Sequence, residues 1–319
     1  MKINKVKLTV AASAVVLFSV FFYTGYQFGL KQAETTFPEP EEVWAKEESA
    51  RIDVGISPDV VRLPDASWRM YYAVEEGIVS AISQDGLKWS KEEGVRINPN
   101  KKSKDQRLVD NPAIIKLKEG GYRMLYEGSD ATQKNFAIFS AVSTDGSTWK
   151  KEKGVRLQDT NRFDQKIAAT PDVVKPRGSS WYMYYSDGDT IKLAVSDDEG
   201  ESWRKRTLSG LPNACLDPSV IVMSDGVFRM YFVKSESEEK LTGAVIISAR
   251  STNGYDWEVE KGARVSADKG AIMVLDPDVV LVSLGKMRMY YTQLDKGLLT
   301  GKGANAPKLS IRSANLELR

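Results

Sequence analysis

The hydrophobic pattern of this chain repeats about every fifty residues. Five aromatic segments alternate partly between apolar and polar positions, as half-buried strands do. They read WRMYYA from Trp68, YRMLYE from Tyr122, WYMYYS from Trp181, FRMYFV from Phe228 and MRMYYT from Met287. Ahead of each lies an apolar run that opens with an x-Pro step: SPDVVRL from Ser57, NPAIIKL from Asn111, TPDVVKP from Thr170, DPSVIVM from Asp217 and DPDVVLV from Asp276. Each unit therefore begins with two predicted strands.

A third strand and a tight turn follow in four of the units. The turn segments read SQDGLKW (Ser83–Trp89), STDGSTW (Ser143–Trp149), SDDEGESW (Ser196–Trp203) and STNGYDW (Ser251–Trp257). Asp-Gly and Asn-Gly suit a hairpin turn because its central positions need positive φ angles. A fourth strand follows each Trp. We interpret the turns as structural connections between the third and fourth strands, with the Trp packed on or between units.

Units of four strands at this period predict an all-β fold, a five-bladed β-propeller. The fifth unit, APKLSIRSANLELR, ends without a Trp. However, WAKEESARI (Trp44–Ile52) matches the outer strand WSKEEGVRI (Trp89–Ile97). We expect this N-terminal strand to complete the last blade and so to remove an open sheet edge. The propeller then spans residues 44–319.

Residues 1–30 predict a single transmembrane helix. Three lysines precede an apolar run from Leu8 to Leu30, which is long enough to cross a bilayer, and their charge favours a cytoplasmic N-terminus. We expect an uncleaved signal anchor; a cleaved signal peptide, which would release a secreted domain, is the alternative. Residues 31–43 are acidic, contain two prolines and are typical of a linker. The propeller is thus expected outside the cytoplasm, tethered to the membrane.

Composition removes several kinds of chemistry. The chain has 45 Lys and Arg against 43 Asp and Glu, spread without a basic stripe, so nucleic acid is not an expected partner. It has no His and a single cysteine, Cys215, which excludes an intrachain disulfide and every His-based triad or metal site. Acid–base chemistry is left to carboxylates, Tyr, Lys or Cys215. With no His to activate it, Cys215 reads as a small buried side chain.

The repeated unit resembles the five-bladed propeller glycosidases of the arabinanase, β-xylosidase, invertase and mannoside phosphorylase clan. The features that carry the resemblance are the Pro-x-Val-Val run, the Tyr-Arg-Met-Tyr-Tyr strand and the Ser-x-Asp-Gly-x-x-Trp turn, over about Trp44 to Arg319. The octet from Ser196 is also similar to the Asp-box of sialidases. Sialidases have six blades and an arginine triad, whereas this chain has five units.

The resemblance implies three carboxylates at the mouth of an axial funnel: a base or nucleophile Asp, a modulating Asp and a general-acid Glu. In the clan the first of these opens an innermost strand at an Asp-Pro or similar step. Here only the fourth and fifth steps keep the Asp, at Asp217 and Asp276. The first has Ser57, with Asp59 behind its proline, and no step carries Glu. The clan's order of Asp, Asp and Glu is therefore absent.

Nine residues are our candidates for the site because innermost strand starts and the adjoining strand ends face one end of a propeller channel. The catalytic candidates are Asp110, Asp217 or Asp276 as base and Glu127 as acid, and the substrate-binding candidates are Asp59, Asp172, Asp278, Arg107 and Asn111. Crowded carboxylates repel one another, which raises pKa values as a general acid requires. The structural alternatives are turn-closing aspartates bonded to amides, a solvated Glu127 and a surface ion pair for Arg107.

Two functions remain open. The acid-rich mouth and the glycine-rich segment Gln293–Pro307, which reads as a flap or a plain surface loop, favour a glycosidase-like propeller that binds and hydrolyses a carbohydrate. The missing Glu step favours a non-catalytic propeller that binds a protein or glycan at the cell surface. No cofactor is indicated, and no ligand spacing identifies a metal, although channel carboxylates suit hard cations such as calcium or sodium.

Overall fold

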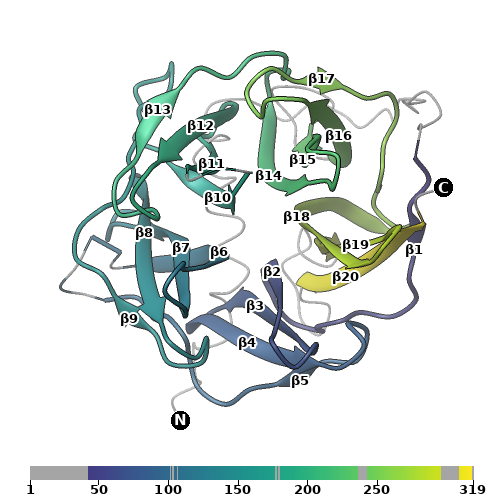
Figure 1. Cartoon of the computed structure of the whole chain (residues 1–319), viewed down its shortest axis with the longest axis horizontal. Helices are drawn as coiled ribbons and strands as arrows, with labels where there is room; N and C mark the ends of the chain where they lie inside the picture. The colour runs from purple at the N-terminus through teal and green to yellow at the C-terminus, as the bar shows by residue number, and fades with distance from the viewer. Residues whose placement is uncertain are drawn as a thin grey trace, which may run out of the picture.

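Five four-stranded antiparallel sheets surround a central axis in the computed structural model of the chain, which confirms the predicted five-bladed propeller (Figure 1). The first strand of each blade is innermost and the fourth is outermost. The structure describes residues 42–100, 102, 104–105, 107–176, 178, 180–235, 243–295 and 309–317.

The blades follow one another along the chain. The first comprises β2 (Ile56–Arg62), β3 (Trp68–Val74), β4 (Gly77–Ser83) and β5 (Ser90–Lys91). The second comprises β6 (Leu108–Lys116), β7 (Tyr122–Ser129), β8 (Phe136–Ser143) and β9 (Lys150–Lys151). The third comprises β10 (Ala169–Val174), β11 (Trp181–Ser186), β12 (Ile191–Ser196) and β13 (Arg204–Arg206). The fourth comprises β14 (Cys215–Val222), β15 (Phe228–Lys234), β16 (Val245–Ser251) and β17 (Glu258–Val259). The fifth comprises β18 (Ala271–Ser283), β19 (Lys286–Asp295), β20 (Leu309–Glu317) and β1 (Ala45–Lys46).

The second strands are more deeply buried than their partial alternation predicted. β3 and β7 are buried almost along their whole lengths, because each blade is packed between two neighbouring blades and so has no solvent face at this depth. A methionine at the centre of each second strand has no exposed surface: Met70, Met124, Met183, Met230 and Met289. These strands therefore form the hydrophobic core between the blades.

Each tight turn is held rigid by its own side chains. In the second blade, Asp145 Oδ1 accepts hydrogen bonds from the backbone N–H groups of Ser147 and Thr148, both at 2.8 Å. Ser143 Oγ accepts another from Gly146 N at 2.8 Å. These hydrogen bonds hold the pKa of the Asp145 carboxyl well below its usual range. The turn links β8 to β9, as predicted for a structural connection.

The turns also fasten each blade to the preceding one. Tyr71 in the first blade donates a hydrogen bond to the Gly146 carbonyl of the second blade at 2.6 Å, and Arg69 donates to the Asp145 carbonyl at 3.1 Å. Trp149 packs edge-on against Tyr71, with ring centroids 5.7 Å apart. The tyrosine contact recurs between Tyr184 and Gly254 and between Tyr290 and Gly86. The repeated Trp thus packs between blades.

In the fifth blade the N-terminal segment takes the place of this turn. β1 pairs with β20, so the predicted closure by the two ends of the chain is confirmed (Figure 1). Trp44 packs edge-on against Tyr231 of the fourth blade at 5.3 Å, as Trp149 does against Tyr71. Tyr231 donates its hydroxyl hydrogen to the Glu42 carboxylate at 3.2 Å, and Arg229 forms an ion pair with it. Glu42 therefore supplies the acceptors that turn carbonyls supply elsewhere.

The predicted signal anchor at residues 1–30 lies outside the described residues, as does the linker up to residue 41. Within the part of the chain that the structure describes, no helix has the length and apolar character needed to cross a membrane.

We predict that closing the ring depends on Glu42 and Trp44. Trp44→Ala should lower the free energy of unfolding by about 3–5 kcal/mol because it empties the space beside Tyr231. Glu42→Gln should lower it by about 1.5–3 kcal/mol, the range for hydrogen bonds to charged groups. Chemical denaturation of the full chain measures both. The control is Glu48→Gln, an exposed site in the same segment, which should leave stability unchanged; an equal loss in the control would contradict the prediction.

Candidate functional site

A strained backbone step opens every innermost strand. The residue before the proline is left-handed in all five blades: φ is 53° at Ser57, 48° at Asn111, 46° at Thr170, 53° at Asp217 and 46° at Asp276. This conformation costs about 1–2 kcal/mol for a residue with a side chain. The strand pairing shifts its register at each step, as in a β-bulge. Bulges re-aim side chains, and these turn polar groups toward the axis.

The axial channel is narrow and polar. Its wall consists of the x-Pro steps and the residues that follow them: Ser57, Pro58, Asp59, Asn111, Pro112, Thr170, Pro171, Asp172, Asp217, Pro218, Ser219, Asp276, Pro277 and Asp278. The cavity measures about 30 Å³, which is room for water but far less than the roughly 300–1,000 Å³ of a small-molecule pocket. A ligand larger than a few water molecules can therefore reach these residues only from an end of the channel. We call the end where the innermost strands begin the mouth.

One layer of the channel joins the blades to one another. The residue after the proline accepts a backbone N–H bond from the next blade in four of the five blades. These bonds run to Asp59 from Ile114 (3.3 Å), to Asp172 from Val220 (2.5 Å), to Ser219 from Val279 (3.0 Å) and to Asp278 from Val60 (2.9 Å). The second blade has Ala113 at this position. Asp59, Asp172 and Asp278 thus have a structural role in addition to lining the channel.

The second blade carries a carboxylate pair that the other blades lack. Asp110 on β6 lies directly opposite Glu127 on β7, and both side chains are buried. Asp110 Oδ1 accepts the backbone N–H of Asn111 at 2.7 Å. Glu127 Oε2 accepts the Asn111 side-chain amide at 2.9 Å and the backbone N–H of Thr170 at 3.1 Å, whereas Oε1 has no partner in the structure. The corresponding pairs elsewhere are Ile56–Ala73, Ala169–Ser186, Leu216–Val233 and Leu275–Thr292.

Asp217 and Asp276 form a second pair beside the first. Asp217 Oδ2 accepts the backbone N–H of Asp276 at 3.4 Å, and each of the two carboxyl groups affects the pKa of the other. Two carboxyl groups that interact in this way titrate as a pair. Unlike Asp110 and Glu127, both are partly accessible. They are therefore the carboxylates that a molecule at the mouth can touch.

Burial raises the pKa values of these acids. It raises the pKa of Asp110 to about 7, assisted by the nearby charge of Asp276, and the pKa of Glu127 to about 8, assisted by Asp110. Burial also raises the pKa of Asp172 to about 7 and the pKa values of Asp217 and Asp276. No Lys or Arg forms an ion pair with any of them in the described part of the chain.

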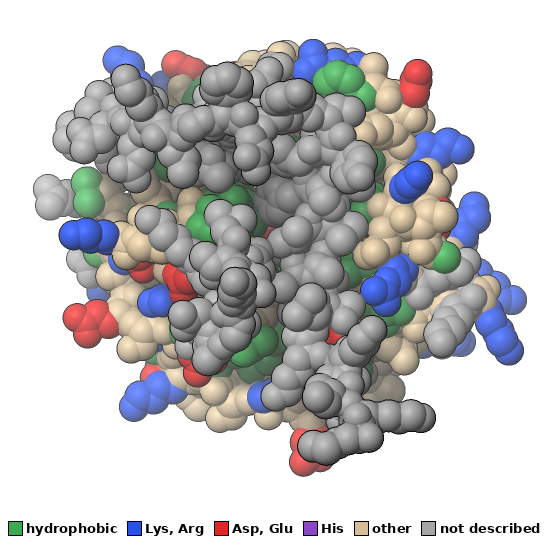
Figure 2. Space-filling model, turned by 180° about the vertical axis from the view of Figure 1, so that it is seen from behind, with side chains coloured by type: hydrophobic (Ala, Val, Ile, Leu, Met, Phe, Trp, Pro, Cys, Tyr) green, Lys and Arg blue, Asp and Glu red, His purple; other side chains and the backbone are tan. Residues whose placement is uncertain are grey.

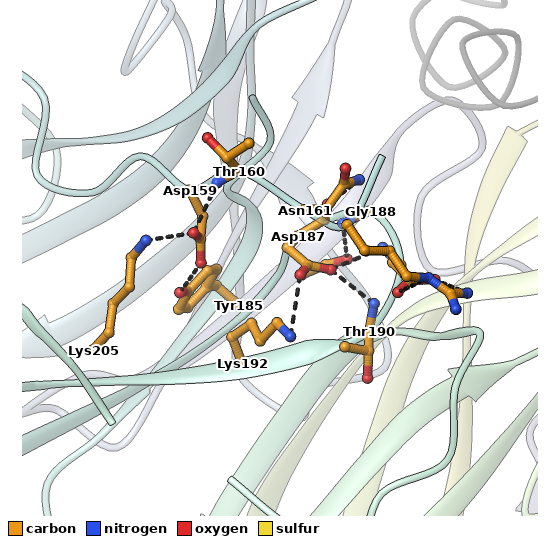
Figure 3. Close-up of polar contacts among 12 residues, drawn as sticks. Asp159, Thr160, Asn161, Tyr185, Asp187, Gly188, Thr190, Lys192 and Lys205 are labelled. Carbon is orange, nitrogen blue, oxygen red and sulfur yellow. Dashed lines mark hydrogen bonds and ion pairs between the residues drawn. The ribbon is translucent and has the colours of Figure 1, made fainter. Parts of the chain in front are cut away.

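The acids in the loops around the mouth, unlike the axial acids, form ion pairs. Asp187 is paired with Lys192 at 3.3 Å, and Asp159 with Lys205 (Figure 3). Asp189 is paired with Arg162 at 2.9 Å. On one face of the ring, Lys and Arg side chains are interspersed with Asp and Glu side chains (Figure 2). These loop acids are thus paired with bases, whereas the axial acids have raised pKa values and no basic partner among the described residues.

The structure brings together eight of the nine candidate residues. Asp110, Asn111, Glu127, Asp217 and Asp276 meet near the mouth, with Asp59, Asp172 and Asp278 one layer deeper. Arg107 is exposed and is not part of the channel wall.

Glu127 is completely buried, so the alternative of a solvated strand-end charge does not hold. The segment Gln293–Pro307 lies outside the described residues from position 296 onward. Ser57, Thr170 and Thr292 were not among the candidates, although Thr292 Oγ1 accepts the backbone N–H of Ser57 at 3.0 Å. Ser57 and Thr170 could have been found from the sequence, because each is the residue before the proline of an x-Pro step.

We predict that the folded protein loses stability as the pH rises from about 4 to about 8. A carboxyl with a raised pKa binds more protons in the folded chain than in the unfolded chain, so its stabilising contribution is complete below about pH 4 and is lost as the pH passes the folded pKa. The loss is about 1.4 kcal/mol per pH unit for each such group. Glu127→Gln removes one group and should flatten the slope.

Urea denaturation of the full chain at several pH values between about 5 and 8.5 tests this prediction. The control is Glu119→Gln on the exposed turn between β6 and β7, which should keep the wild-type slope. The same slope in Glu127→Gln as in wild type would show that Glu127 is ionised throughout this range.

Comparisons with known proteins agree with this architecture. A solved glycoside hydrolase superposes with a TM-score of 0.64 at 16% identity, over 87% of this chain and 91% of that one. An arabinanase from Bacillus subtilis gives 0.62 at 16% identity, over 83% and 96%. An N-acetylgalactosamine deacetylase from F. plautii, solved with blood group B trisaccharide, gives 0.63 at 14% identity, over 88% and 94%. Identities this low establish the fold alone.

A search of curated protein sequences finds no match. A family model described as BNR repeat-like domain matches residues 46–286, which is most of the propeller and well over half of the chain. The chain therefore belongs to the BNR repeat-like domain family.

Proposed function

We propose that this propeller binds a carbohydrate at the mouth of its axial channel. The observation that carries the proposal is the set of five left-handed x-Pro steps, which hold Ser57, Asn111, Thr170, Asp217 and Asp276 around one axis. Strained backbone of this kind clusters at binding and catalytic sites. Hydroxyl, amide and carboxyl groups together provide both donors and acceptors, which suits a ligand rich in hydroxyl groups.

The neighbours in fold point to the same ligand class. They include a glycoside hydrolase, arabinanases and an enzyme in complex with a trisaccharide. Because a fold does not fix a function, the ligand class rests first on the polar groups at the mouth, with the neighbours as support.

Binding without hydrolysis is the function that the geometry favours. Hydrolysis requires two carboxyl groups separated by about 5–5.5 Å or about 6.5–9.5 Å, with the sugar or a water between them. Asp217 accepts the backbone N–H of Asp276 at 3.4 Å, so this carboxylate is already engaged by the neighbouring innermost strand. Glu127 and Asp110 are buried beneath the mouth, where they accept hydrogen bonds from Asn111 and Thr170.

Hydrolysis is the second candidate, on one specific observation. A pKa of about 8 keeps Glu127 protonated at neutral pH, as a general acid must be, and Asp110 with a pKa of about 7 is the adjacent base. This function would require the second blade to open enough for Glu127 to reach a glycosidic oxygen.

The location completes the proposal. The apolar run from Leu8 to Leu30 would anchor the propeller in a membrane, with its channel outside the cytoplasm. A tethered binding propeller would hold a glycan close to the cell surface.

The test is binding of the full chain, in detergent micelles, to fragments of arabinan, xylan, fructan, mannan and sialoglycan, with released sugar quantified in parallel. We expect at least one fragment to bind without sugar release. Asp217→Asn and Asp276→Asn should each weaken that binding about tenfold, or about 1.4 kcal/mol, by changing the groups at the mouth. The matched control is Asp225→Asn, in the exposed turn between β14 and β15 at the far end of the same strand.

Three outcomes separate the functions. Binding that is weakened at the mouth and unchanged in the control supports the proposal. Sugar release that disappears in Glu127→Gln, while the variant still folds, would replace binding by hydrolysis. Failure of wild type to bind any fragment would contradict the carbohydrate proposal and direct attention to a protein partner.

A further inference from the structure

We propose that Phe163 is a stacking platform for a sugar ring, and that the ligand is a neutral glycan chain lying across the mouth. This inference rests on the proposed function, because it adds a contact and a ligand class to the same site.

Phe163 is unusual in its exposure. It is 56% exposed, and no other Phe, Trp or Tyr among the described residues is exposed to this extent. Every other described aromatic side chain is at least partly buried within or between blades. Single apolar side chains are common on protein surfaces and do not by themselves indicate a binding site. The inference therefore depends on how Phe163 is held and where it lies.

The loop that carries Phe163 is built to a fixed shape. The buried Asn161 side chain accepts the backbone N–H groups of Phe163 at 2.9 Å and Gln165 at 3.1 Å. Its amide nitrogen donates to the Gln165 side chain at 3.0 Å, and Asp164 adopts a left-handed φ of 59°. An exposed ring on a rigid loop loses little conformational entropy when a ligand stacks on it.

The same loop is tied to the mouth. The Asn161 amide also donates to the backbone carbonyl of Asp187 at 3.0 Å, in the turn between β11 and β12 (Figure 3). Asp189 lies two residues further along the same turn. Its backbone carbonyl accepts the backbone N–H of Ala214 at 3.1 Å. Ala214 lies three residues before Asp217, so a short chain of contacts joins the Phe163 loop to a carboxylate at the mouth.

A charged pair fixes one side of the ring. The Arg162 guanidinium lies over Phe163 at 4.8 Å from the ring centroid and is paired with Asp189 at 2.9 Å. Because the guanidinium covers one face, the exposed area of the ring belongs mainly to its other face and edge. Sugar rings present a face of C–H groups that packs on an aromatic face, and the Arg162–Asp189 pair offers donors and acceptors for adjacent hydroxyls.

The dimensions and charges of the mouth narrow the ligand class. The channel volume of about 30 Å³ admits water but no sugar ring, so a glycan must lie across the mouth instead of inserting an end. A glycan chain that lies across the mouth can contact Phe163 and Asp217 at the same time. The channel wall contains aspartates, including Asp217 and Asp276, and no Lys or Arg, so it offers no cation to the carboxylate of an acidic sugar. A neutral chain such as arabinan or mannan fits, and a sialoglycan does not.

The experiment compares the full chain with two variants at Phe163 and one at a control site, using fluorescently labelled fragments of arabinan, xylan, fructan, mannan and sialoglycan. Phe163→Ala should weaken binding of a neutral fragment about tenfold or more, whereas Phe163→Trp should stay within about threefold of wild type because it keeps an aromatic face. Leu284→Ala is the control, since Leu284 is fully exposed on the turn between β18 and β19, at the end opposite the mouth.

The outcomes keep the two proposals apart. Loss in Phe163→Ala, retention in Phe163→Trp and an unchanged control, with unaltered melting temperatures, support the platform. Equal binding by Phe163→Ala and wild type, while Asp217→Asn is weakened, would overturn the platform and leave the mouth as the binding site. Preference for sialoglycan over the neutral fragments would overturn the neutral-ligand inference. Failure of wild type to bind any fragment would overturn both proposals.

Discussion

A left-handed residue before a proline, repeated five times, is the constraint on which this structure depends. A side chain in that conformation is unfavourable, and the surrounding blades hold it at Ser57, Asn111, Thr170, Asp217 and Asp276. The bulge at each step turns polar side chains toward the axis and shifts the strand register. The same bulge places Asp110 opposite Glu127. Without these steps the centre of the propeller would be an ordinary junction of five apolar strands.

The acids at the axis and the acids of the turns show how one residue type serves two purposes. In the turns, aspartates accept several N–H bonds and remain ionised: Asp198 has a pKa lowered to about 2 despite partial burial, because Ser202 and Ser196 donate to it. At the axis, burial and neighbouring acids raise the pKa values instead. The aspartates in the turns at the rim therefore have lowered pKa values, and those at the centre have raised ones. This separation leaves the channel polar without a large buried charge.

The sequence predicted the fold and most of the channel because both follow from local, repeated signals. The x-Pro steps, the aromatic strands and the Gly-containing turns are each recognisable within a few residues, and Trp44 identified the closing strand by its match to Trp89. What could not be predicted depends on contacts between distant segments. Asp110 and Glu127 lie opposite each other because of a bulge whose register is set by the fold. The role of Glu42 depends on how the N-terminal segment closes the fifth blade. Phe163 lies in a loop with no repeat, where its exposure depends on the buried Asn161.

The most direct test of a carbohydrate site at the mouth is hydrogen–deuterium exchange of the full chain with and without a neutral oligosaccharide at saturating concentration. The account predicts slower exchange in the loop around Phe163, at the starts of β14 and β18 around Asp217 and Asp276, and in the turn between β11 and β12. The turn between β18 and β19 at the opposite end should not change. Protection confined to that opposite end or to the outermost strands would contradict a site at the mouth.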